Sequence, residues 1–106
     1  MIVDFLEYFL SDNYDGKVVI KNSRQTYNVR DIKRLVAGVM RKLKTVTSEN
    51  IIIDIDDNLT FIVNFLACIL TEKNIYLCSN TEKYSNYIQN PYVLNEEDIE
   101  PEEFVN

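Results

Sequence analysis

Three aspartates, Asp54, Asp56 and Asp57, have the spacing in this chain most suited to a reactive site. Asp54 lies near the end of the β-branched run 51–55, which predicts a buried strand, and Asp56 and Asp57 directly follow it. Open α/β sheets bind ligands beyond the carboxyl ends of their strands. Clustered carboxylates at such a point suit a magnesium ion or an aspartate that accepts a phosphoryl group. An acidic turn before a helix is also what capping and the helix dipole favour without any reaction. We therefore assign no catalytic or metal-binding residue to this turn.

The residue types that are missing exclude several kinds of chemistry. The chain of 106 residues contains no histidine, which removes Ser-His and Cys-His nucleophile pairs, most catalytic zinc sites and the usual general base near neutral pH. Gly16 and Gly38 are the only glycines, so neither a Gly-rich dinucleotide turn nor a phosphate-binding loop can form. We expect this chain to bind no cofactor and to contribute no catalytic residue by itself.

Basic side chains gather on the segment 29–44, and a basic helix could follow the phosphates of a nucleic acid. The alternative is a solvated face opposite an apolar stripe. Because the net charge of the chain is −6 and no stacking or Gly-rich motif lies beside these bases, we expect no nucleic-acid partner. The six bases are Arg30, Lys33, Arg34, Arg41, Lys42 and Lys44.

Charge is unevenly distributed between the two parts of the chain. Residues 1–44 contain nine bases and five acids, a net charge of +4, whereas residues 45–106 contain two bases and twelve acids, a net charge of −10. Such asymmetry can mark an interaction surface.

The two cysteines and the apolar runs indicate the compartment. Cys68 and Cys78 lie within apolar runs, which favours two buried thiols over a disulfide bond or a metal site. No apolar run approaches the roughly 20 residues of a membrane helix, and the N-terminus has neither a basic start nor a small-residue cleavage site. These features predict a cytoplasmic protein without a membrane partner.

The order of apolar and turn-forming segments predicts one α/β domain over residues 1–106. Asn28 and Asp31 form a variant of the capping box at the start of the surest helix. Alternation of helices and strands after the hairpin implies a mainly parallel sheet with right-handed crossover helices. The expected elements are a short helix at 3–10, hairpin strands at 17–21 and 25–27, a helix at 29–44, a strand at 51–55, a helix at 59–70, a strand at 74–78, a helix at 81–89, a strand at 92–94 and an acidic tail at 96–106.

The helix expected over 58–71 is apolar nearly all round. Its only polar stripe consists of Thr60, Asn64, Cys68 and Thr71, and such a helix must be covered on nearly all sides. A domain of 106 residues can hardly provide that cover. We therefore expect either the remainder of a longer polypeptide or a self-association partner to cover the 58–71 helix.

Short motifs in a fixed order give this chain a family resemblance. Residues 15–95 contain a hairpin that ends in Thr-Tyr, a helix with Val-Ala, a strand of three isoleucines, a helix with Phe-Leu-Ala and a closing strand, as in adenylate-forming enzymes. The chain resembles the N-terminal subdomain of an acyl-CoA synthetase or AMP-ligase. The family usually has glycine at the position of Glu72, often proline at that of Cys78, and Glu-Leu in place of Val29-Arg30. The motifs are Thr26-Tyr27, Val36-Ala37, Ile51 to Ile53, Phe61 with Phe65-Leu66-Ala67, and Lys73 to Asn80.

The resemblance implies an AMP-forming acid–thiol ligase. Such an enzyme uses ATP and magnesium to convert a carboxylic acid to an acyl-adenylate, which it transfers to the thiol of coenzyme A or a carrier protein. The family's phosphate loop, ribose-binding aspartate and catalytic lysine lie well beyond residue 106, so no site residue is transferred to this chain. It would be an N-terminal scaffold portion that is inactive alone. The alternative is a stand-alone, flavodoxin-like interaction or regulatory module that uses Asp54, Asp56 and Asp57 or docks a partner through its apolar helix.

Overall fold

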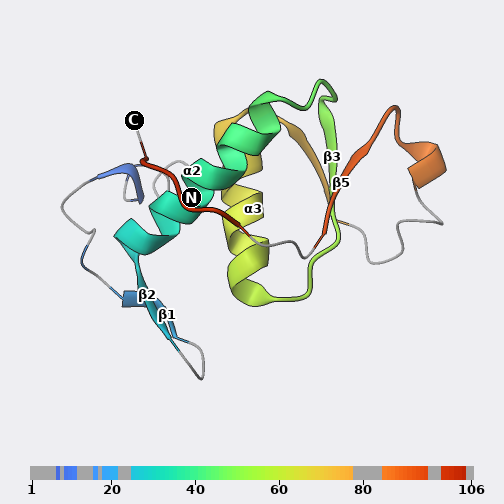
Figure 1. The fold of residues 1–106 in the computed structure, drawn as a ribbon. Helices are drawn as coiled ribbons and strands as arrows, with labels where there is room; N and C mark the ends of the chain where they lie inside the picture. The colour runs from blue at the N-terminus through green and yellow to red at the C-terminus, as the bar shows by residue number, and fades with distance from the viewer. Residues whose placement is uncertain are drawn as a thin grey trace.

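The fold is taken from a computed structural model, which describes residues 7, 9–11, 16, 18–21, 25–77, 85–95 and 99–104. Among these residues, two long helices and five strands form the framework, with one short 3₁₀ helix (Figure 1). In chain order they are β1 (Val18–Lys21), β2 (Thr26–Asn28), α2 (Val29–Lys44), β3 (Asn50–Ile53), α3 (Asn58–Leu70), β4 (Asn74–Leu77), the 3₁₀ helix η2 (Ser85–Tyr87) and β5 (Tyr92–Leu94).

A three-stranded parallel sheet forms one layer of the domain. The strand order is β4-β3-β5, and Ile52 in the central strand pairs with Tyr76 on one side and Val93 on the other. Helix α3 connects β3 to β4, and it packs against both the sheet and α2, which lies beside it (Figure 1). The predicted α/β class with a parallel sheet is therefore confirmed.

The β-hairpin leads directly into the first long helix. Strand β1 pairs antiparallel with β2, with an irregularity between Val18 and Ile20. Asn28 ends β2 and is also the N-cap of α2: its side-chain oxygen accepts a hydrogen bond from Asp31 N at 2.8 Å, and its own N–H donates to Asp31 Oδ2 at 3.1 Å. The predicted hairpin and capping box are both confirmed, and the cap fixes where the ribbon turns into the helix.

The core joins the inner stripes of both helices to one face of β3. Ile51 and Ile53 belong to the cluster that contains the buried residues of α2 and α3, whereas Ile52 lies outside that cluster because alternate strand residues point to opposite faces. All three isoleucines are nevertheless buried. The prediction of a strand buried on both faces is confirmed, although β3 ends at Ile53 rather than at residue 55.

The amphipathic helix predicted over 81–89 is wrong where the structure describes it. Within 85–90 the chain forms the short 3₁₀ helix η2, followed by bends. Asn90 adopts a left-handed φ of 47° directly before Pro91, and the residue before a proline avoids helical conformation. Residues 81–84 and most of the helix predicted at 3–10 lie outside the described residues, while positions 7, 9 and 10 are helical.

Helix α3 turns its polar stripe inward. Asn64 is 4% exposed, and its Nδ2 atom donates to Thr60 O at 2.7 Å, while the Thr71 hydroxyl donates to Ala67 O at 2.8 Å. The helix backbone thus accepts the hydrogen bonds that Asn64 and Thr71 donate. Of the apolar side chains on α3, Ile62 is the exposed one at 37%. The chain therefore covers most of a helix whose composition indicated that it needed outside cover.

Helix α3 ends in a left-handed backbone conformation that glycine favours, but the residue there is Glu72. Glu72 N donates to Ile69 O and Lys73 N donates to Cys68 O, which is the hydrogen-bond pattern of a Schellman motif. This motif requires a left-handed residue, and Glu72 has a φ of 58°. A side chain in that region costs about 1–2 kcal/mol. Lys73 then secures the turn, since its Nζ donates to Val46 O at 3.1 Å and to Ser48 O at 2.8 Å.

Replacing Glu72 by glycine should stabilise the domain. Glu72→Gly removes the steric cost of the left-handed backbone, and the greater freedom of glycine in the unfolded chain offsets only part of that gain. We expect the free energy of unfolding in urea to rise by about 0.5–1 kcal/mol. Glu72→Ala is the matched control, because it removes the same carboxylate but keeps the β-carbon. A decrease in stability for Glu72→Gly relative to Glu72→Ala would contradict the Schellman geometry.

Candidate functional site

The acidic turn between β3 and α3 serves as a helix cap. Asp57 is the N-cap of α3, and its Oδ2 atom accepts hydrogen bonds from Thr60 N at 2.9 Å and from Thr60 Oγ1 at 2.7 Å. These bonds, the backbone one first, lower the pKa of the Asp57 carboxyl below its usual value. Asp54 belongs to the sheet instead, because its N–H donates to Leu94 O at 2.9 Å. The predicted capping role is confirmed for Asp57.

The carboxylates and thiols do not gather into a metal site within the described part of the chain. No three Asp, Glu or Cys side chains there lie close enough together to hold a metal ion. Cys68 is buried, as predicted, and burial raises the pKa of its thiol to about 11 against the smaller opposing effect of Lys73. A thiol of that pKa stays protonated at neutral pH and is a weak nucleophile. Cys78 lies outside the described residues.

The basic helix α2 is more than a solvated face. Lys33 is only 3% exposed: its Nζ atom donates to Ser11 O at 3.4 Å and lies 5.9 Å from the ring centre of Phe9 and 5.8 Å from that of Phe104. Its ammonium group is therefore enclosed by two aromatic faces, which attract a cation. Four other bases of α2 are exposed and form the expected solvated face: Arg30, Arg34, Arg41 and Lys44.

Part of the segment expected to be an acidic tail crosses this helix. Residues 99–104, here called the strap, cross α2 without forming helix or strand (Figure 1). Glu102 N donates to Arg34 O at 3.0 Å, and the Glu102 carboxylate forms an ion pair and hydrogen bond with Arg41. Phe104 packs edge-to-face on Phe9, with 6.2 Å between ring centres. Backbone, charge and aromatic contacts thus all join the strap to α2.

Gly38 makes this approach possible. A β-carbon at that position would overlap the Glu100 carbonyl oxygen and lie 3.0 Å from the Glu100 carbonyl carbon. The backbones of the strap and of α2 meet there without a side chain between them. Glycine inside a helix costs about 1 kcal/mol relative to alanine. A glycine is nevertheless needed at position 38, because a β-carbon there would prevent close contact with the strap.

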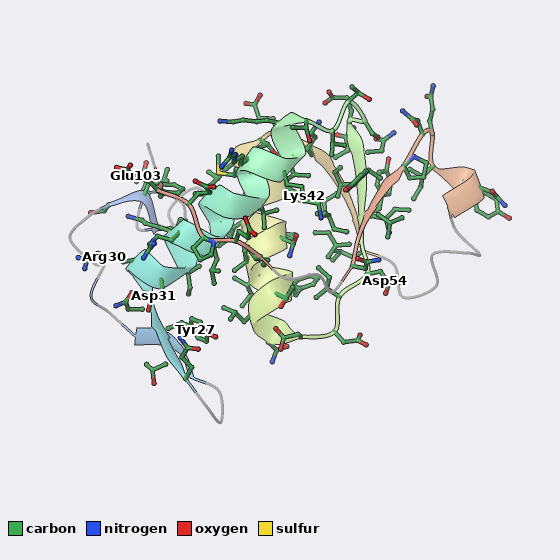
Figure 2. All side chains as sticks on the ribbon, viewed as in Figure 1. Tyr27, Arg30, Asp31, Lys42, Asp54 and Glu103 are labelled. Carbon is green, nitrogen blue, oxygen red and sulfur yellow. The ribbon has the colours of Figure 1, made fainter. Side chains whose placement is uncertain are left out.

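Ile99 lines two cavities. The larger, of about 510 Å³, reaches from Gly38, Arg41 and Lys42 on α2 to Asn64 on α3. The smaller, of about 380 Å³, is lined by Tyr27, Arg34 and Leu59 among others. The strap therefore crosses a groove between α2 and α3 without filling it. Figure 2 shows Lys42 on α2 and Glu103 on the strap, whereas Asp54 lies apart from them, near the ends of β3 and β5.

Sequence reasoning missed the strap and the burial of Lys33. Glu102 and Arg41 are 61 residues apart, and an extended segment has no hydrophobic period that would indicate what it packs on. The charge asymmetry was the available signal, since the acidic end of the chain lies on the basic helix. Gly38, noted only as one of two glycines, was a second signal.

Comparisons with known proteins add no assignment to this geometry. No protein-family model matches the chain, and no curated protein matches it. Among the described residues, no helix is both long and apolar enough to cross a membrane.

Gly38→Ala should destabilise the domain although alanine is the better helix former. The added β-carbon would push the strap away from α2, and overpacking of this kind costs about 1–3 kcal/mol, which exceeds the gain in helix propensity. Thermal and urea unfolding measure the change. Gly16→Ala is the control, because nothing lies within 4 Å of a β-carbon there. A stabilised Gly38→Ala variant would mean that the strap does not rest on α2.

The Asp57 cap should make part of the stability depend on pH. Asp57→Ala should lower the free energy of unfolding by about 1 kcal/mol at neutral pH, while Asp57→Asn keeps an acceptor and changes it little. Because folding lowers the pKa of Asp57, its ionised form stabilises the domain above the unfolded pKa of about 3.9, and this contribution is lost as pH falls through the folded value. Urea unfolding from about pH 6 to pH 2 should show a smaller loss for Asp57→Asn than for the wild type. Equal losses would contradict the cap.

Proposed function

We propose that this chain is the N-terminal scaffold portion of an AMP-forming acid–thiol ligase. The order of its elements carries the proposal: an antiparallel hairpin, a capped amphipathic helix and a parallel β3–α3–β4 unit follow one another as the resemblance implies. In the complete enzyme, ATP and magnesium would activate a carboxylic acid as its adenylate before transfer to a thiol. This chain would supply framework and no reacting group.

The turn after α3 supports this proposal independently of element order. The family usually has a helix-ending glycine where this chain has Glu72. Glu72 nevertheless adopts the left-handed conformation that glycine favours, with a φ of 58°. A backbone geometry maintained against the preference of its residue is what divergence from a glycine-containing ancestor would leave.

Exposed apolar side chains on the sheet and on α3 suit cover by further protein. Leu77 on β4 is 61% exposed and Tyr76 is 40% exposed, and β4 lies at an edge of the described sheet. Ile62 on α3 adds to the apolar surface. We propose that the remainder of the same polypeptide, or a second copy, covers these residues in a cytoplasmic enzyme. No nucleic acid or membrane takes part.

The stand-alone module remains the alternative, with less support. It would use Asp54, Asp56 and Asp57 as a site, but Asp57 is engaged in capping α3 and Asp54 N–H pairs with β5. Its other route, docking through the 58–71 helix, has little free apolar surface on α3 itself, because Ile62 is the exposed apolar residue there.

A nucleotide titration tests the scaffold role. Isothermal titration calorimetry of the folded chain with ATP and MgCl₂ should give no saturable heat, because the residues that bind phosphate in the family lie outside it. ADP and AMP serve as matched ligands. Saturable binding of ATP in the micromolar range, about −8 kcal/mol, would contradict the assignment of the phosphate machinery to another part of the enzyme.

The coding sequence separates the two functions. If the proposal is right, the reading frame continues past Asn106 and encodes a Ser/Thr/Gly-rich loop within about the next hundred residues. Sequencing the transcript determines this directly. A stop codon immediately after Asn106 would contradict the ligase portion and favour the stand-alone module.

A further inference from the structure

The strap is bound to α2 in the way that a short peptide binds to a groove. It contributes one backbone hydrogen bond through Glu102 N, one charge pair through the Glu102 side chain, and one aromatic contact through Phe104. Ile99 adds an apolar contact with the core. Its sequence over 99–104, Ile-Glu-Pro-Glu-Glu-Phe, is thus an acidic peptide with an apolar residue at each end.

We propose that the α2 groove is a docking site for an extended acidic segment of a partner protein that ends in an aromatic residue, and that the strap is its intramolecular ligand. The α2 groove is defined by Arg34, Gly38, Arg41 and Lys42 on α2 together with Lys33 at its aromatic end. This proposal goes beyond the ligase assignment and does not rest on it.

Charge selects the class of partner. The groove presents the Arg34, Arg41 and Lys42 side chains, and the Glu102 carboxylate of the strap pairs with Arg41. Glu100 and Glu103 add two more negative charges to the strap. Removal of the strap would leave Arg41 without the Glu102 carboxylate and would open one side of Lys33. A segment with a carboxylate opposite Arg41 and an aromatic ring over Lys33 restores both, whereas a basic segment would repel Arg41.

The aromatic end distinguishes a peptide from a simple polyanion. Lys33 Nζ lies over the rings of Phe9 and Phe104 at nearly equal distances, 5.9 and 5.8 Å, and the two rings meet edge to face. A nearly buried ammonium group needs such partners, because an unpaired buried charge is costly. A ligand without an aromatic ring would leave this end of the groove incomplete.

The strap is an imperfect occupant, which leaves room for competition. Ile99 lines two cavities, of about 510 and 380 Å³, that the strap leaves open. A partner with a larger apolar side chain at that position would fill part of this space and gain dispersion contacts that the strap lacks. A segment of the same design with tryptophan at the Ile99 position should therefore displace the strap more readily than a copy of the strap itself.

A binding experiment with the full chain tests the proposal. The probe is a fluorescein-labelled synthetic peptide with the sequence of residues 98–106, and the protein is either the wild type or the variant Glu102→Lys/Phe104→Ala, which weakens the strap without altering α2. Fluorescence anisotropy should show binding at least about tenfold tighter to the variant, because the bound strap reduces the competent fraction of the wild type.

Matched controls locate the bound peptide. Adding Gly38→Ala to the variant should abolish binding, because the β-carbon blocks the backbone of any occupant of the groove. A scrambled peptide of the same composition should bind at least about tenfold more weakly, since it keeps the charge but loses the spacing. Equal affinity for wild type and variant, for the scrambled peptide, or in the presence of Gly38→Ala would overturn the proposal.

A measurement on the wild type keeps the test independent of variants that fail to fold. Titration with the peptide carrying Ile99→Trp, followed by two-dimensional ¹⁵N NMR, should shift the amide signals of Gly38 and Arg41 and return those of Glu102 and Phe104 to the positions of an unbound segment. Shifts confined to other elements would overturn the proposal.

Other occupants are outcomes of the same experiments. A concentration-dependent dimer of the wild type in sedimentation, lost in Gly38→Ala, would assign the groove to the strap of a second copy. Displacement of the peptide by a single-stranded RNA oligomer at lower concentration than by unlabelled peptide would assign it to nucleic acid. Either result would overturn the proposal that the α2 groove binds an acidic segment of a partner protein.

Discussion

The close contact between the strap and α2 depends on the missing side chain at Gly38. Because no β-carbon stands there, the Glu100 carbonyl reaches the helix, Glu102 N bonds to Arg34 O, and Phe104 closes over Lys33 and Phe9. The strap in turn lines two cavities together with residues of α2 and α3, and it brings acidic residues onto the basic helix. The uneven charge distribution could have indicated an external partner, but part of it is explained by the ion pair between Arg41 and Glu102 within the molecule.

Much of the framework could be predicted from periodicity, and the contacts between distant segments could not. The apolar stripe and capping residues of 29–44 gave α2 at its observed bounds, and the isoleucine run gave β3 with an error of two residues at its end. The segment 81–89 misled, because its weak amphipathic pattern was overridden by the backbone at Asn90 and Pro91. The strap has no period, and the residues it contacts are 61 to 95 positions earlier. Only the charge pattern and one glycine in a helix indicated it.

The chemistry suggested by single residues changes once their neighbours are known. Asp57 is one of three clustered acids in the sequence, but its hydrogen bonds to Thr60 make it a helix cap. Lys33 is one of six bases on a helix, but it is buried between two rings. Glu72 is an ordinary charged residue that occupies a position suited to glycine. Two residues of this domain therefore depart from their usual preferences. Gly38 lies inside a helix, where its missing side chain admits the strap, and Glu72 adopts a conformation that glycine favours. The first concerns the α2 groove, and the second concerns the turn that ends α3.

Hydrogen exchange at one amide tests the docked strap most directly. Glu102 N–H is bonded to Arg34 O at 3.0 Å, and no helix or strand of the strap offers it another reason for protection. In native-state exchange followed by NMR, this amide should exchange at least about tenfold more slowly than an unstructured amide of the same sequence, because exchange requires the strap to leave α2. Exchange of Glu102 N–H at the rate of an unstructured chain would contradict the docked strap and, with it, the α2 groove as a site that binds acidic segments.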